Sequence, residues 1–299
     1  MTDVNAPRTI AVIGFGEAGG ILGEDLARAG LEVVTYDILF DSPAACAAML
    51  NKARAAGVRA APALGEALAG ADIVISAVTA TASTQVAADS RSSLTSRQIF
   101  LDINSISPAA KRETARLIET SGAHYVEAAV MAPVPQQRLA VPMLLGGPHA
   151  PAVARTLCAL GMNATAVAGD IGAASAIKMC RSIVIKGLEA LTVECVMAAR
   201  EFDAVEQVFA SLDNTFPHMG WTTTLPDYLV GRVAEHGRRR AAEMREVERT
   251  LGSVGVTPLM AHATAERQQR LVDAMAARNI SFPGSAVFSW RSLLDALDD

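Results

Sequence analysis

The chain has 299 residues with 51% hydrophobic and 19% charged side chains, and its formal net charge is -5. This length allows two domains with sizeable cores, and the acidic balance argues against a polyanion-binding surface and predicts no nucleic-acid partner. Because no stretch is apolar over the length of a membrane span and residues 1–8 lack the apolar run of a signal peptide, we expect a cytoplasmic protein with no membrane partner. Five scattered histidines give no metal-ligand spacing, so no metal is predicted. The cysteines lie far apart in apolar helical patterns and are predicted to be reduced and buried; they are Cys46, Cys158, Cys180 and Cys195.

The N-terminal region has the pattern of a dinucleotide-binding βαβ unit. Residues 9–13 (TIAVI) form an apolar run typical of a buried strand, and the glycine-rich segment 14–19 (GFGEAG) follows it. A helical pattern then extends to Gly30, a second strand is predicted at 32–36 (EVVTY), and Asp37 stands at its end. Strand, GxGxxG, helix, strand and acid within about 30 residues predict a Rossmann-type nucleotide site.

Each glycine of this segment has a different task. Gly14 permits the tight turn, Gly16 lets a pyrophosphate approach the backbone, and Gly19 lets the helix pack on the sheet. The helix N-terminus offers N–H groups to the phosphates, and Asp37 is placed to accept hydrogen bonds from the ribose hydroxyls while repelling a 2′-phosphate. We therefore predict NAD in preference to NADP. The predicted cofactor-binding residues here are Gly14, Phe15, Gly16, Glu17, Ala18, Gly19 and Asp37.

The strand pattern continues as a doubly wound sheet. A third strand is predicted at 73–78 (IVISAV), and its end places Val78 and Thr79 at the carboxyl edge, where such sheets bind ligands, so both join the cofactor site. Another strand at 99–102 (IFLD) is followed by a helix to Glu119, with Ser107 as its N-cap and Pro108 as its first residue. Further strands are predicted at 125–130, 142–145 and 165–167, with a helix at 151–160 that ends at Gly161. The Rossmann domain is predicted to span residues 1–169.

A long helix is predicted at 171–200, because this segment lacks proline and has one internal glycine after its start. Its first turn consists of small residues, so another backbone or a ligand can approach closely. Lys178, Arg181 and Ser182 lie at i, i+3 and i+4 and therefore share one face. A lysine and an arginine beside a tight helix start are unusual for a plain core helix.

The rest of the chain has no alternating strand pattern, which predicts an all-α C-terminal domain over residues 170–299. A helix is predicted at 225–251, ending at Gly252, and another at 264–277. The basic cluster from His236 to Arg240 is flanked by glutamates at i,i+4-type spacing, so it is interpreted as a solvated, salt-bridged face.

Four places in the chain resemble the β-hydroxyacid dehydrogenases, the family that includes 3-hydroxyisobutyrate dehydrogenase and 6-phosphogluconate dehydrogenase. The first is the glycine segment 14–19, and the second is 102–108 (DINSISP), similar to the family's D-x-S-T-x-x-P loop. The third is 127–130 (EAAV) leading to Gly146 and Gly147, in the place of D-A-P-V-S-G-G. The fourth is 172–182, similar to G-x-G-x-x-x-K-x-x-N-N.

The resemblance implies a Rossmann domain, an interdomain helix and a helical domain that completes the active site and forms a homodimer. It places Lys178 on the family's catalytic lysine, and it implies that Asn104 and Ser105 hold the hydroxyl and carboxylate of the substrate. In the relatives, residues of the helical domain close the active site, so Arg239 or Arg240 reaching the cofactor is an open alternative to the solvated face.

The chain also departs from the family pattern. Met131, Ala132 and Pro133 replace a Ser-Gly-Gly that lines the substrate pocket, and Arg181 and Ser182 replace an asparagine pair. An arginine suits a carboxylate, and the loss of small polar groups predicts a substrate with a bulkier or more apolar tail. These five residues are therefore expected to contact a small carboxylate substrate.

The predicted activity is an NAD(P)-dependent dehydrogenase acting on a CH–OH group, specifically that of a 3-hydroxyacid. Oxidation of an alcohol requires removal of its hydroxyl proton while hydride leaves to the nicotinamide. Lys178 is the predicted base, since burial and cationic neighbours bring a lysine pKa toward neutrality.

Two alternative functions stay open. Imine reductases share this architecture but typically carry a different residue at the lysine position, and a non-catalytic NAD sensor would bind cofactor without turnover.

Overall fold

The computed structural model describes residues 7–283 and 288–298. These described residues form two compact units, of which the first ends at Lys178 and the second begins at Met179. Residues 1–6, which make up most of the N-terminal segment that is predicted to lack a signal peptide, lie outside the described residues. Over the described ranges, no helix combines the length and apolar character needed to cross a membrane.

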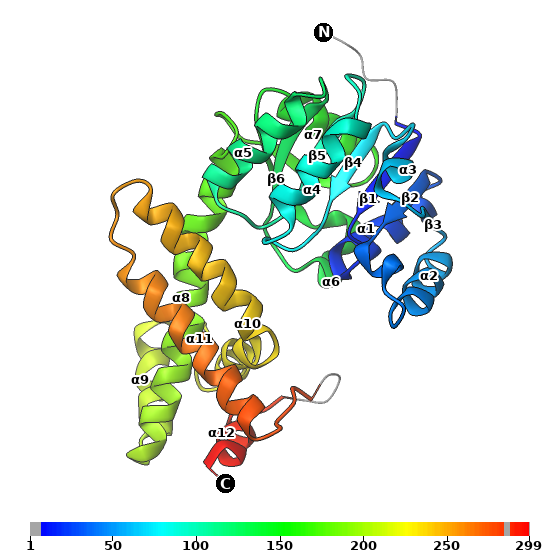
Figure 1. Ribbon diagram of the computed structural model, residues 1–299. Coiled ribbons are helices and arrows are strands. Elements are labelled where there is room, and N and C mark those ends of the chain that lie inside the picture. The colour runs from blue at the N-terminus through cyan, green and yellow to red at the C-terminus, as the bar shows by residue number, and fades with distance from the viewer. Residues whose placement is uncertain (1–6, 284–287, 299) are drawn as a thin grey trace. The chain divides into compact units, whose positions relative to one another are not determined.

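The first unit is built on an eight-stranded sheet with the strand order β3-β2-β1-β4-β5-β6-β7-β8 (Figure 1). Strands β1 to β6 pair in parallel, β7 runs antiparallel to β6, and β8 is parallel to β7. The order of the first six strands is that of a Rossmann fold, with two strands added at one side. The strands are β1 (Thr9–Ile13), β2 (Glu32–Tyr36), β3 (Arg59–Ala60), β4 (Ile73–Ser76), β5 (Ile99–Asp102), β6 (His124–Val130), β7 (Pro142–Gly146) and β8 (Asn163–Ala166).

Helices cover both faces of this sheet, because its central strands are apolar on both sides. Helices α1, α2 and α7 pack on one face through residues such as Leu22, Leu26 and Leu157. Helices α3, α4 and α5 pack on the other through Leu68 and Ile118, among others. The helices of this unit are α1 (Glu17–Arg28), α2 (Cys46–Ala55), α3 (Leu64–Leu68), α4 (Ser83–Ser90), α5 (Pro108–Glu119), α6 (Val134–Gln137) and α7 (Ala150–Ala159), with 3-10 turns η1 (Ile38–Asp41), η2 (Arg91–Ser93) and η3 (Arg138–Ala140).

The second unit is helical, and it contains most of the long helix α8 (Ala173–Glu201) with the four helices that follow. Its core joins all of them around Trp221 and Trp290, with Val196 of α8 and Met275 of α11 in the same cluster. Helices α10 and α11 run side by side and antiparallel (Figure 1). The later helices are α9 (Val205–Thr215), α10 (Leu225–Gly252), α11 (Leu259–Ala277) and α12 (Trp290–Asp298).

The predicted fold class, a doubly wound sheet followed by a long helix and an all-α part, is confirmed by this architecture. Most predicted elements agree with the structure to within a few residues. The third strand is an exception of interest, since it ends at Ser76 and not at Val78. Val78 N donates to the side-chain Oδ1 of Asn104 at 2.7 Å, so the chain leaves the sheet before that residue.

The prediction that the cysteines are buried is wrong. All four are unpaired thiols, with Cys158 and Cys180 exposed and Cys46 and Cys195 half-buried. Cys158 follows the buried Leu157 on α7, so the helix turns its side chain about a third of a turn away from the core. Its Sγ donates to Ala164 O at 3.3 Å. In helices rich in alanine, the apolar pattern is too broad to show which face is turned inward.

Candidate functional site: the carboxyl edge of the sheet

The glycine-rich loop between β1 and α1 leaves an open surface at one of its three glycines. Gly14 has a φ of 87°, and a Cβ there would lie 2.5 Å from Ala77 O. A Cβ at Gly19 would lie 1.9 Å from Gly14 O, whereas one at Gly16 would meet nothing within 4 Å. Gly16 is also the N-cap of α1, and within residues 7–283 and 288–298 this helix has no capping hydrogen bond from a side chain. The loop therefore offers unpaired N–H groups beside open space, which fits the pyrophosphate of a dinucleotide.

Asp37 ties the end of β2 to this loop. Its Oδ2 accepts from Phe15 N at 2.6 Å and its Oδ1 from Leu39 N at 2.9 Å, and the residue is buried. The carboxylate thus fixes the conformation of the glycine loop from the neighbouring strand. Its predicted hydrogen bonds to a ribose stay a prediction.

Lys52 is a charged residue at the same loop that the sequence analysis did not find. It projects from α2, and its Nζ donates to Phe15 O at 2.8 Å and to Gly16 O at 2.7 Å. Its ammonium also lies 5.3 Å from the centre of the Phe15 ring. This cation reinforces the positive end of α1. Lys52 is more than 30 residues from the loop, on a helix that the sequence pattern did not reveal, so no local signal pointed to it.

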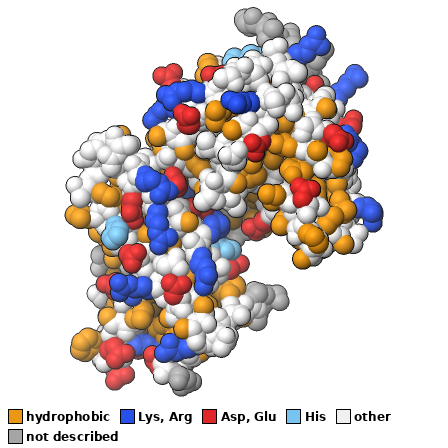
Figure 2. All heavy atoms as spheres, in the orientation of Figure 1, with side chains coloured by type: hydrophobic (Ala, Val, Ile, Leu, Met, Phe, Trp, Pro, Cys, Tyr) orange, Lys and Arg blue, Asp and Glu red, His pale blue; other side chains and the backbone are white. Residues whose placement is uncertain are grey.

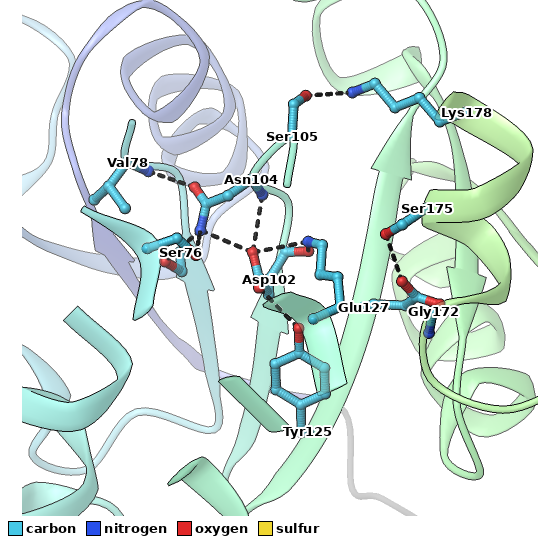
Figure 3. Close-up of polar contacts among 12 residues, drawn as sticks. Ser76, Val78, Asp102, Asn104, Ser105, Tyr125, Glu127, Gly172, Ser175 and Lys178 are labelled. Carbon is cyan, nitrogen blue, oxygen red and sulfur yellow. Dashed lines mark hydrogen bonds and ion pairs between the residues drawn. The ribbon is translucent and has the colours of Figure 1, made fainter. Parts of the chain in front are cut away.

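Asn104 lies at the centre of the carboxyl edge, in the loop after β5 (Figure 3). Its Oδ1 accepts from Val78 N at 2.7 Å. Its Nδ2 lies 3.0 Å from Ser76 Oγ, 3.1 Å from Ser83 Oγ and 2.8 Å from Asp102 Oδ1. The amide therefore joins the ends of β4 and β5 to the first residue of α4. Through Val78, it also contacts the predicted cofactor site.

Asp102 is the fully buried carboxylate on which this arrangement is built. Its Oδ1 accepts from Asn104 N at 2.9 Å and pairs with Lys111 Nζ at 2.9 Å, and its Oδ2 accepts from Tyr125 OH at 2.8 Å. Burial, together with the neighbouring Asp102 charge, raises the pKa of Tyr125 well above its usual value. Tyr125 is therefore a donor at all ordinary pH values, and the carboxylate has a donor on each oxygen.

Lys178 contacts the loop that contains Asn104. Its Nζ donates to Ser105 Oγ at 2.5 Å, and the side chain is half-buried (Figure 3). The lysine is on α8 and the serine is in the loop after β5, so the contact joins residues that are 73 positions apart. The structure thus brings together two predicted site residues, one predicted as catalytic and one as substrate-binding.

Glu127 anchors the start of α8, and with it the helix that carries Lys178. This buried carboxylate accepts from Gly172 N at 2.6 Å, Ala174 N at 3.1 Å and Ser175 Oγ at 2.6 Å (Figure 3). Gly146, opposite on β7, leaves the space it needs, since a Cβ there would lie 2.3 Å from Glu127 Oε1. A carboxylate at a helix N-terminus is stabilised by the amides and by the helix dipole. Glu127 stands where the family pattern has a shorter aspartate.

The remaining predicted substrate residues fall into two groups. Met131, Ala132 and Pro133 follow β6 directly and are half-buried, so they lie in another loop at the carboxyl edge. Arg181 and Ser182 belong to the second unit, one turn beyond Lys178 along α8. Arg181 is exposed, whereas Ser182 is buried. Their part in substrate binding stays a prediction.

The interpretation of His236 to Arg240 as a solvated face is correct for part of the cluster and wrong for Arg240. Arg239 is exposed and pairs with Glu243 at 2.6 Å, and Figure 2 shows basic and acidic side chains interspersed over this unit. Arg240 is buried, and its Nε donates to Glu189 Oε2 at 2.7 Å. It lies on the inner face of α10, three residues after the buried Gly237. This helical spacing is visible in the sequence, but the many charged residues around it favoured the interpretation as an exposed face.

Known proteins share both the sequence pattern and this fold. A family model described as the NAD binding domain of 6-phosphogluconate dehydrogenase matches residues 9–170, and a domain of unknown function matches residues 199–271. A conserved hypothetical protein from Sinorhizobium meliloti 1021 is 37% identical with a TM-score of 0.77, and the match covers 97% of this chain and 95% of that one.

Two further solved structures connect the chain to dehydrogenases. A conserved protein of unknown function, described as structurally similar to 3-hydroxyacid dehydrogenases, is 30% identical with a TM-score of 0.71, covering 90% of this chain and 98% of that one. The 3-hydroxyisobutyrate dehydrogenase of Mycobacterium tuberculosis, studied with L-serine, is 20% identical with a TM-score of 0.72, covering 98% and 99%. At that identity the likeness concerns the fold alone. With the first family model spanning more than half of the chain, the protein belongs to the family defined by the NAD-binding domain of 6-phosphogluconate dehydrogenase, as a divergent β-hydroxyacid dehydrogenase-like member.

Proposed function

We propose that this protein is an NAD-dependent dehydrogenase that oxidises a 3-hydroxyacid, or reduces the matching carbonyl compound, with Lys178 as the general base and acid. The observation that supports this most strongly is the contact between Lys178 Nζ and Ser105 Oγ, at the same sheet edge as the open amides beside Gly16. The family match supports a nicotinamide dinucleotide, and the carboxylate of Asp37 next to the glycine loop supports NAD over NADP.

The proposed chemistry divides between the cofactor and the chain. A bound nicotinamide supplies the hydride acceptor. Lys178, as a neutral amine, takes the hydroxyl proton of the substrate, and in the reverse direction the ammonium returns it to the carbonyl oxygen. Ser105 orients the amine through its hydrogen bond, and the family resemblance implies that it also contacts the substrate. The first turn of α8, held by Glu127, fixes the position from which Lys178 extends.

We further propose a substrate with a carboxylate and an apolar tail. Arg181 is an exposed guanidinium one turn beyond Lys178, and a guanidinium binds a carboxylate with two parallel hydrogen bonds. Ser182 is a hydroxyl at i+4 from the lysine, and Met131, Ala132 and Pro133 offer apolar surface at the sheet edge. NADH formation with a panel of 3-hydroxyacids, including aryl-substituted ones, identifies the tail that the protein accepts.

A homodimer in the cytoplasm completes the proposal. Helix α8 exposes Val184 (70%) and Leu191 (56%), one heptad apart, and a second copy of the helical unit would remove this apolar surface from water. The unpaired thiols suit a reducing compartment. Sedimentation velocity of the wild type and of Leu191→Glu tests the dimer, and a monomeric wild type would refute it.

The substitution Lys178→Met tests the catalytic proposal. We expect the rate of NADH formation to fall by about 10²–10⁴-fold, while the affinity for NADH changes little. Cys180→Ser is the matched control, because this exposed neighbour on α8 has no assigned role, and we expect its variant to keep full activity. An unchanged rate in Lys178→Met would contradict the role of the lysine.

Turnover of an amine but of no hydroxyacid would favour an imine reductase, and NADH binding without any turnover would favour a sensor.

A further inference from the structure

We infer that Asn104 is a positioning residue that holds the cofactor edge of the sheet and the Ser105–Lys178 pair in a fixed relation, and that it does not bind the substrate. The inference rests on the proposed function for its catalytic part. It differs from the role that the family resemblance implies for this position, where the loop pattern has a serine that holds the substrate.

The Asn104 amide uses its hydrogen-bonding capacity within the protein. Asn104 is 4% exposed. An asparagine side chain has two N–H donors and one carbonyl acceptor. The two donors face three acceptors, on Ser76, Ser83 and Asp102, and the carbonyl accepts from Val78 N. Both N–H donors are therefore engaged, so a substrate oxygen could accept from this amide only by displacing one of these contacts and leaving a buried polar group unpaired, which is costly.

The length of the Asn104 side chain matters as well, because its contacts lie on separate segments of the chain. Asn104 contacts groups on different strands and loops. These are Val78 N, the hydroxyls of Ser76 and Ser83, and the Asp102 carboxylate. A serine at this position has one O–H donor on a shorter side chain, so it cannot donate to Asp102 Oδ1 and to the hydroxyl of Ser76 or Ser83 together. The asparagine is therefore specific to an arrangement in which the loop after β4 is held by the loop after β5.

Asn104 contacts a residue of the predicted cofactor site and is followed in the chain by the serine that contacts Lys178. Val78 and Thr79 form part of the predicted cofactor site, and the Thr79 hydroxyl contacts Thr81 Oγ1 at 3.1 Å within the same turn. On the other side, Ser105 follows Asn104 in the chain and accepts from Lys178. A shift of the Asn104 amide therefore moves both the cofactor turn and the partner of the proposed base. A misplacement of about 1 Å is enough to reduce a catalytic rate by about 100-fold.

The test compares Asn104→Ser with a matched buried amide at the opposite end of the same strand. Gln98 directly precedes β5, is also 4% exposed, donates to Leu68 O at 2.7 Å and accepts from Thr95 N at 2.8 Å. The measurements are the Kd of NADH by fluorescence, thermal unfolding, and kcat and KM with the best acid of the panel. Ser83→Ala, which removes one acceptor of the amide, is a milder second variant if Asn104→Ser folds poorly.

We expect Asn104→Ser to weaken NADH binding by about tenfold, the effect of losing about one buried hydrogen bond, and to lower kcat while KM for the acid stays unchanged. We expect Ser83→Ala to show the same pattern to a smaller degree. Gln98→Ala should lower the unfolding temperature without changing NADH affinity. Unchanged NADH affinity with a raised KM in Asn104→Ser would overturn the inference in favour of a substrate contact.

Equal loss of NADH affinity in Gln98→Ala and Asn104→Ser would also overturn it, since the effect would then follow from lost stability alone. The NADH measurement requires no turnover. If the wild type oxidises no acid, the proposed function fails, while the NADH affinities of the three variants still decide whether Asn104 holds the cofactor edge.

Discussion

Each unit contains a carboxylate that is buried beside a basic side chain, Asp102 in the first and Glu189 in the second, and the two clusters differ in what surrounds the charge. In the first unit, Asp102 receives hydrogen bonds on both oxygens from Asn104, Lys111 and Tyr125. In the second, Glu189 of α8 pairs with Arg240 of α10 and accepts from Gln268 Nε2 at 3.2 Å. One cluster connects strand ends at a candidate site, and the other connects three helices.

The second cluster also leaves more of its polar capacity unsatisfied. Gln268 Oε1 is buried without a hydrogen-bond partner in the described part of the chain. Burial raises the pKa of Glu189, although Arg240 opposes this, and burial lowers the pKa of the nearby Lys186 despite its ion pair with Glu243. A buried ion pair can thus serve mainly to join helices, whereas the same kind of pair at a sheet edge also holds residues of a candidate site.

The largest expected effect is on the helical cluster, with Arg240→Met. Removing the guanidinium leaves Glu189 buried without its cation, which costs about 3–5 kcal/mol of unfolding free energy. Urea unfolding measures the loss. NADH affinity should stay unchanged, because Arg240 is paired within the helical unit. A variant of wild-type stability would show that the pair contributes little.

The corresponding change in the first unit is Lys111→Met. Asp102 keeps Tyr125 and Asn104 as donors, so the expected loss is smaller, about 1.5–3 kcal/mol. In contrast to Arg240→Met, this variant should also bind NADH more weakly, because Asp102 holds Asn104. Urea unfolding and NADH fluorescence on the two variants together test the comparison, and equal NADH affinities would remove the distinction between the clusters.

A dependence on pH should appear in the helical cluster. The pKa of Lys186 is lowered from 10.5, mainly by burial, while Glu243 and Glu189 act against this and Arg240 acts with it. Between the lowered pKa and 10.5, the unfolded chain binds more protons than the folded one, so this group makes the free energy of unfolding rise with pH. The slope is at most about 1.4 kcal/mol per pH unit.

Urea unfolding of the wild type and of Lys186→Met, measured from about pH 7 upward, shows this contribution as a difference that grows with pH. Lys52→Met is the control, since Lys52 is an exposed lysine in the other unit. Parallel curves for the wild type and Lys186→Met would contradict the prediction.

The smallest expected effect is that of Arg239→Ala, the neighbour of the buried arginine. Its side chain is 56% exposed and its guanidinium pairs with Glu243 at 2.6 Å, and exposed pairs contribute about 0.2–1 kcal/mol. In urea unfolding, the loss of unfolding free energy should therefore be several-fold smaller for Arg239→Ala than for Arg240→Met. A loss in Arg239→Ala as large as that in Arg240→Met would mean that exposure does not govern the strength of these pairs.

Local patterns in the sequence were sufficient for much of the fold and for part of the candidate site. Residues 9–37 predicted the first βαβ unit because strand, glycine turn and helix signals are short-range. Ser107 and Pro108 likewise predicted the start of α5, and Ser107 Oγ does accept from Ala110 N. Short elements such as β3 and α3 were missed because two to five residues carry too little periodicity to be distinguished from a loop.

The sequence by itself determined the doubly wound sheet, the long helix and the position of Lys178 on it, since apolar periodicity and glycine spacing are properties of neighbouring residues. Only the tertiary structure decided that Lys178 contacts Ser105, that Asn104 holds Val78, and that Arg240 is buried while Arg239 is exposed. These contacts join residues far apart in the chain. Their existence depends on strand order and on helix rotation, which no local pattern encodes.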